Sequence, residues 1–121
     1  MKLNYAILLI GLLFVMSPSV FSQKNKFEEI KIKTSSQCGM CKERIEEALA
    51  FEAGIKSSDL DLETQIITVI YKPQKTNPDK IKKAISKIGY DADDVLADEK
   101  AYSKLPDCCK KPGDPDRTEH K

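Results

Sequence analysis

The 121-residue sequence has no tryptophan, a single histidine and no marked excess of either charge. It holds 20 Lys and Arg against 19 Asp and Glu, a formal net charge of +1, so it lacks the basic surplus of nucleic-acid-binding domains. It also has no paired carboxylates, no phosphate-binding glycine loop and no Ser-His-Asp set. We therefore expect a protein that binds no nucleic acid and is not an enzyme.

The longest apolar run, residues 6–16, is too short to span a bilayer comfortably. Lys2 precedes it, Ser17 and Pro18 break it, and Ser22 offers a small residue for cleavage. This pattern is typical of a secretory signal peptide over residues 1–22, cleaved near Ser22. We therefore expect a periplasmic or secreted protein, whose thiols must be paired, bound to a ligand or kept reduced by a partner in an oxidising compartment.

The remaining chain alternates between strand and helix patterns. Period-two alternation or continuous apolar character predicts strands, and apolar residues three or four apart predict helices. Residues 66–71 are apolar on both faces, which predicts a central strand that forms a hairpin with the strand before it. The predicted strands cover residues 27–34, 59–63, 66–71 and 91–97, and the predicted helices run from Cys41 to about Phe51 and from Pro78 to about Ile88.

The order β-α-β-β-α-β predicts an α+β, ferredoxin-like domain over residues 23–97. Its four-stranded antiparallel sheet would carry two helices on one face. Residues 98–121 have a different composition: one or two helical turns are expected over 98–105, and the segment after Pro106 lacks the apolar residues to build a core. We expect this cysteine-bearing tail, residues 98–121, to be flexible and the whole protein to be a monomer.

Cys38 and Cys41 form a CxxC pair at the start of the first predicted helix. A helix N-terminus has unpaired N–H groups and partial positive charge, which favour the thiolate that binds metal. Two thiolates with no histidine beside them favour soft cations such as Cu(I) or Hg(II) over a four-ligand zinc site. A thiol–disulfide redox protein and a structural disulfide remain alternatives, although redox sites of this kind usually have a tryptophan nearby.

Residues 27–97 resemble the heavy-metal-associated domain family, which includes copper chaperones, modules of metal-pumping ATPases and the periplasmic mercury-binding protein. The resemblance lies in Cys38-x-x-Cys41 after the first strand, the helix that follows, the hairpin ending in Tyr71, and residues 88–92 after the second helix. It implies a soft-metal-binding protein that passes one ion, Cu(I) or Hg(II), to a metal-transporting membrane protein by thiolate exchange.

Two departures from the family pattern bear on the metal. The family usually has Gly-Met before its cysteine pair, where this sequence has Ser35 and Ser36, and its nearby methionine is Met40 between the cysteines. The zinc-type members often have an acidic residue before the first cysteine, where this sequence has Gln37. By resemblance, Tyr90 and Met40 are candidates for contacts beside the metal. Tyr90 is equally interpretable as a core aromatic.

Cys108 and Cys109 lie about seventy residues from the first pair. A disulfide with Cys38 or Cys41, a separate soft-metal site and an incidental tail are all open. Our hypothesis is that the tail folds back so that one or both thiols reach the ion held by Cys38 and Cys41.

Overall fold

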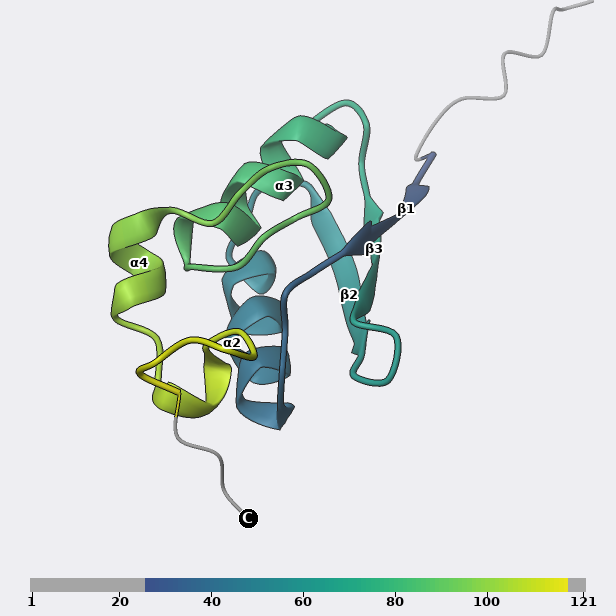
Figure 1. Ribbon diagram of the computed structural model, residues 1–121. Helices are drawn as coiled ribbons and strands as arrows, with labels where there is room; N and C mark the ends of the chain where they lie inside the picture. The colour runs from purple at the N-terminus through teal and green to yellow at the C-terminus, as the bar shows by residue number, and fades with distance from the viewer. Residues whose placement is uncertain (1–25, 118–121) are drawn as a thin grey trace, which may run out of the picture.

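The computed structural model describes residues 26–117 (Figure 1), so the predicted signal peptide lies outside the described residues. Three antiparallel strands form one sheet: β1 (Glu28–Lys33), β2 (Ile55–Asp61) and β3 (Ile66–Tyr71). Strand β3 lies between the other two. The predicted hairpin and the predicted central strand are both confirmed.

Two helices, α2 (Gly39–Ala50) and α3 (Pro78–Lys87), lie on the same side of this sheet (Figure 1). The side chain of Asn77 accepts a hydrogen bond of 2.9 Å from the Lys80 N–H, the cap that its position before Pro78 predicts. Ile45 and Leu49 of α2 and Ile81 and Ile85 of α3 are buried, so the apolar stripes of both helices close the core. No helix within residues 26–117 has the length and apolar character needed to cross a membrane.

The fourth strand expected over residues 91–97 does not form. Ala92 makes two isolated bridges, one to Thr34 and one to Val95, and Asp93 has a φ of 50°. The Asp93 carboxylate accepts a hydrogen bond from the Lys33 N–H at 2.8 Å, and its own N–H donates to the Lys33 carbonyl at 2.8 Å. The segment therefore folds back into a tight turn that caps the end of β1, and the described sheet has three strands.

The C-terminal segment packs against the domain as far as residue 117, which its composition does not predict. Residues 98–117, here called the C-terminal cap, contain the helix α4 (Glu99–Ser103), as expected, and the 3₁₀ turn η1 (Asp107–Cys109). Leu105 and Cys109 are 4% and 1% exposed and belong to the core of the domain. The cap is ordered because these two side chains are buried by the preceding domain, which the composition of the segment alone does not reveal.

Gly89 sets how closely the cap approaches the domain. It follows α3 with a φ of 103°, and a Cβ placed on it would lie 2.9 Å from the backbone of Ala101 in α4. Only glycine combines this backbone conformation with so short an approach.

We predict that Gly89→Ala lowers the free energy of unfolding by about 1–3 kcal/mol, since it adds both backbone strain and a clash with α4. Gly39→Ala is the control, because a Cβ at Gly39 meets no atom within 4 Å. Urea denaturation of the metal-free variants measures both. Equal midpoints for the two variants would contradict this account of the cap.

Candidate metal site

The loop between β1 and α2 is fixed by buried hydroxyl groups. The Thr34 hydroxyl donates to the carbonyl of Gln65 at 2.9 Å and lies 2.9 Å from the Ser36 hydroxyl. The Gln65 side-chain amide donates to the Ser36 carbonyl, and both Thr34 and Ser36 are buried. Ser36 is thus a structural anchor that holds the residues just before Cys38 against the β2–β3 hairpin.

Cys38 and Cys41 occupy the positions that their spacing predicts. Cys38 is the N-cap of α2, and Cys41 lies buried in its first turn. Their Sγ atoms are 3.4 Å apart. This distance is well beyond the roughly 2.05 Å of a disulfide bond, and all four cysteines are free thiols.

The C-terminal cap brings the other two cysteines to the same place. The Sγ of Cys38 lies 3.6 Å from that of Cys108 and 3.8 Å from that of Cys109. The sulfurs of Cys38, Cys108 and Cys109 all lie within 4.8 Å of one another. With Cys41 they form what we call the four-sulfur cluster, in which Cys38 contacts each of the other three.

The pKa of the Cys38 thiol is lowered below its ordinary value. Burial acts to raise its pKa, but hydrogen bonds from the Cys41 N–H and from the other three thiols outweigh burial and lower it. The pKa of Cys108 is raised, chiefly by its hydrogen bond with Cys38, and that of Cys109 is raised, chiefly by burial. The arrangement thus favours one thiolate, at Cys38, with thiol donors around it.

Tyr90 lies against this cluster and is fully buried. Burial, followed by the neighbouring sulfurs of Cys41 and Cys109, raises the pKa of its phenol. Its hydroxyl has no hydrogen-bond partner of good geometry among the described residues. Tyr90 is therefore both a core aromatic and a donor held beside sulfur. Met40, in contrast, is 48% exposed.

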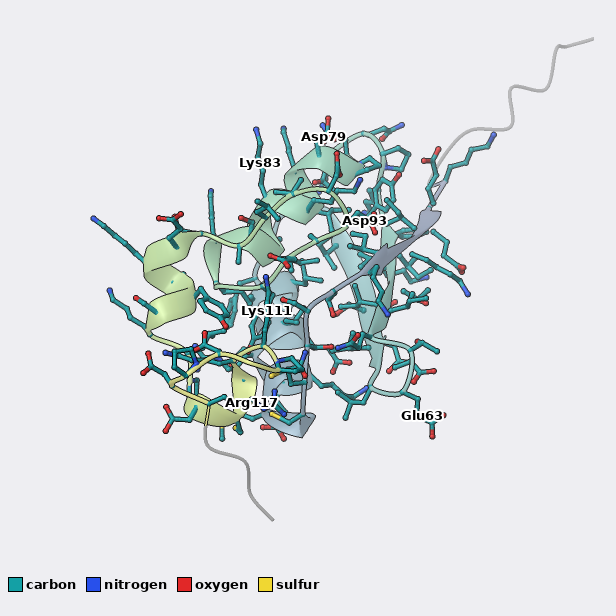
Figure 2. All side chains as sticks on the ribbon, viewed as in Figure 1. Glu63, Asp79, Lys83, Asp93, Lys111 and Arg117 are labelled. Carbon is teal, nitrogen blue, oxygen red and sulfur yellow. The ribbon has the colours of Figure 1, made fainter. Side chains whose placement is uncertain are left out.

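Two contacts that the sequence did not indicate hold the cap over the cysteine loop. The Nζ of Lys111 lies 2.6 Å from the Asp91 carboxylate. Arg117 donates to the Gln37 side-chain oxygen at 3.2 Å and to the Lys110 carbonyl at 2.6 Å. Figure 2 shows Arg117 near the start of α2 and Lys111 farther up the domain. Charged residues so far apart in the sequence carry no local signal that they pair.

Comparison with known proteins supports the interpretation of the fold. Residues 37–91 match the model of the heavy-metal-associated domain. The solved structure of a CopZ metallochaperone is 32% identical, with a TM-score of 0.52 over 54% of this chain and 98% of that one. The chain belongs to the heavy-metal-associated domain family.

Other relatives carry the same domain within different proteins. A copper-exporting P-type ATPase of Staphylococcus aureus is 37% identical over 59 residues, which are 49% of this chain and 7% of the ATPase. Oxidized MerP from Ralstonia metallidurans CH34 is 22% identical, with a TM-score of 0.53 over 55% of this chain and 94% of that one, and shows the shared fold. Heavy-metal-associated domains are metal-binding modules without catalysis of their own. The match ends at residue 91, so it does not include the C-terminal cap.

We predict that Asp91→Asn loosens the cap at neutral pH. Burial acts to raise the Asp91 pKa, but the hydrogen bonds from Lys111 and from the Ala97 N–H outweigh it and hold the pKa below its usual value. A lowered folded-state pKa stabilises the fold above the unfolded value of about 3.9, and that contribution is lost as the pH falls through the folded value. The substitution should cost up to about 1 kcal/mol at pH 7.

Amide hydrogen exchange in α4 and η1 measures this effect. The exchange should be faster in the variant than in the unsubstituted protein at pH 7. The difference from the unsubstituted protein should shrink only as the pH falls below about 3.9 and through the lowered folded-state pKa of Asp91. Asp94→Asn is the control, since the Asp94 side chain is 88% exposed and lies 3.5 Å from Lys82. Equal exchange for Asp91→Asn and Asp94→Asn would show that the Lys111 pair does not hold the cap.

Proposed function

We propose that this protein is a Cu(I) carrier that binds the ion through Cys38 and Cys41 and passes it to a metal-transporting membrane protein. The observation that carries the proposal is the pair of thiols at the start of α2 in a heavy-metal-associated domain, whose Sγ atoms lie 3.4 Å apart. The pKa of one of them, the Cys38 thiol, is lowered. A thiolate at that position is a ligand suited to a soft cation.

Copper is favoured over the other soft ions by the relatives. The ATPase at 37% identity is a copper exporter by name, and the solved structure at 32% identity is a metallochaperone. The mercury-related structure, at 22% identity, supports the fold and carries no argument for Hg(II). Gln37, in place of the acidic residue of zinc-type relatives, leaves no carboxylate directly before Cys38 for Zn(II).

The proposed location is the periplasm or the exterior of the cell. It rests on the signal-peptide pattern of residues 1–22. There the carrier would hold Cu(I) away from other thiols and from oxidants. The partner is proposed to be a membrane transporter because a curated relative that shares the domain is a copper-exporting ATPase.

Transfer would proceed by ligand exchange. A thiolate of the partner bonds to the ion, one carrier sulfur then leaves it, and that sulfur takes up a proton from solvent. Cys38, at the helix start and partly exposed, is better placed to meet the partner than Cys41, which is buried. No change in the oxidation state of the ion or of sulfur is required.

Anaerobic titration of the reduced protein with Cu(I), against a competing chelator, tests this function. We expect tight binding, and Cys38→Ser and Cys41→Ser should each weaken it by at least about tenfold, since each removes a direct ligand. Met40→Leu, at an exposed position in the first turn of α2, is the matched control. The proposal fails if the Cys38→Ser variant binds Cu(I) with the same affinity as the unsubstituted protein. Catalytic reduction of disulfide substrates by the unsubstituted protein would instead favour the redox alternative.

Tyr90→Phe provides a second test, because it removes a buried hydroxyl without changing the ring. In the metal-free protein the free energy of unfolding should stay unchanged or rise by up to about 1–3 kcal/mol, since an unpartnered buried donor is lost. Cu(I) affinity should fall roughly tenfold, because the hydroxyl can donate to a metal-bound thiolate. Urea denaturation and the same Cu(I) competition measure the two effects. Lower stability with unchanged affinity would identify Tyr90 as a core residue only.

A further inference from the structure

We propose that the C-terminal cap completes the metal site, with Cys108 and Cys109 supplying further sulfur ligands to the Cu(I) ion held by Cys38 and Cys41. The inference rests on the proposed function and deepens it. The site would then be closed by the protein's own C-terminal segment and would hold the ion with at least three sulfurs.

The sulfur separations favour a high coordination number. With metal–sulfur bonds of about 2.3 Å, two sulfurs on opposite sides of an ion lie about 4.6 Å apart, whereas those of a tetrahedral site lie about 3.8 Å apart. The three distances from Cys38 are 3.4, 3.6 and 3.8 Å. They are all shorter than the separation in a linear pair and lie near that of a three-sulfur site. Cys38, Cys108 and Cys109 form such a group of three sulfurs, and Cys41 contacts Cys38 from outside it.

Packing alone does not account for both tail cysteines. A buried cysteine such as Cys109 is common in protein cores as a small apolar side chain. Cys108, however, is only partly buried, and its sulfur still contacts Cys38. Both neighbouring cysteines, about seventy residues from Cys38 in the sequence, therefore place their sulfurs against the same thiol.

The polar groups around the cluster point to an anion. Among the described residues, the Tyr90 hydroxyl and the Arg117 Nε are the buried side-chain N and O atoms that have no hydrogen-bond partner. Tyr90 adjoins Cys41 and Cys109, while Arg117 bonds to Gln37 and Lys110, the neighbours of Cys38 and Cys109 in sequence. The Tyr90 hydroxyl is thus a donor beside the place where thiolate charge develops when the thiols bind a metal.

Polar contacts of the cap hold the tail cysteines at the site. Lys110 and Lys111 directly follow Cys109, and both are paired with carboxylates: the Lys110 Nζ lies 3.5 Å from Asp116 and the Lys111 Nζ lies 2.6 Å from Asp91. The contacts of Lys111 with Asp91 and of Arg117 with Gln37 hold the segment after Cys109 against the domain.

X-ray absorption spectroscopy of the reduced protein loaded with one equivalent of Cu(I) counts the sulfur ligands directly. We expect three or more sulfurs in the unsubstituted protein and two, with shorter Cu–S bonds, in the Cys108→Ser/Cys109→Ser variant. Competition titration should show the affinity of that variant lowered by at least about tenfold. The single variant Cys108→Ser, at a partly exposed position, checks that a lost ligand and not a lost fold causes the change.

The outcomes separate this inference from the proposed function. Tight Cu(I) binding by two sulfurs in the unsubstituted protein would overturn the inference and leave the carrier function standing. Cu(I) affinity that is insensitive to Cys38→Ser would instead overturn the carrier function. An affinity unchanged by the double serine substitution would also overturn the inference, since the tail thiols would then be no ligands.

Discussion

The arrangement of the site depends on the contact between the Cys38 thiol and the three other thiols of the chain. Cys38 lies at the N-cap of α2, where the fixed loop of Thr34 and Ser36 holds it, and the C-terminal cap closes over it from the opposite side. Each thiol that donates a hydrogen bond to Cys38 favours its thiolate. One side chain thus joins the domain, the cap and the proposed chemistry.

Two buried polar groups of the metal-free protein have no hydrogen-bond partner among the described residues. An unpartnered buried donor costs about 1–3 kcal/mol, and the Tyr90 hydroxyl and the Arg117 Nε are two such donors. The cost is offset by the burial of Leu105 and Cys109 and by the two polar contacts that hold the cap. In the proposed metal-bound state the Tyr90 hydroxyl would face thiolate charge, so binding the ion would also stabilise the closed site.

Much of the domain followed from local sequence patterns. The apolar stripes of α2 and α3, the Asn77 cap and the doubly apolar strand β3 each predicted the element that formed, because all three patterns act over a few neighbouring residues. The fourth strand failed because Asp93 adopts a left-handed conformation and bonds to Lys33 instead of extending a ladder. The alternation of apolar and polar residues does not reveal that Asp93 adopts this conformation.

The position of the C-terminal cap could not be predicted from the sequence either. Its composition is poor in apolar residues, yet Leu105 and Cys109 are enough to seat it, because the domain supplies the rest of the buried surface. The ion pair of Lys111 with Asp91 and the bonds of Arg117 are contacts between distant segments, which have no periodic signal. The hypothesis that the tail folds back came from the shared chemistry of the cysteines and not from any pattern that predicts structure.

The most direct test of the account is cadmium-113 NMR of the reduced protein loaded with one equivalent of Cd(II), a soft ion whose couplings identify each bound cysteine. The account predicts couplings from one cadmium signal to the β-protons of Cys38, of Cys41 and of at least one of Cys108 and Cys109. Couplings confined to Cys38 and Cys41, or a signal coupled to no cysteine, would contradict it.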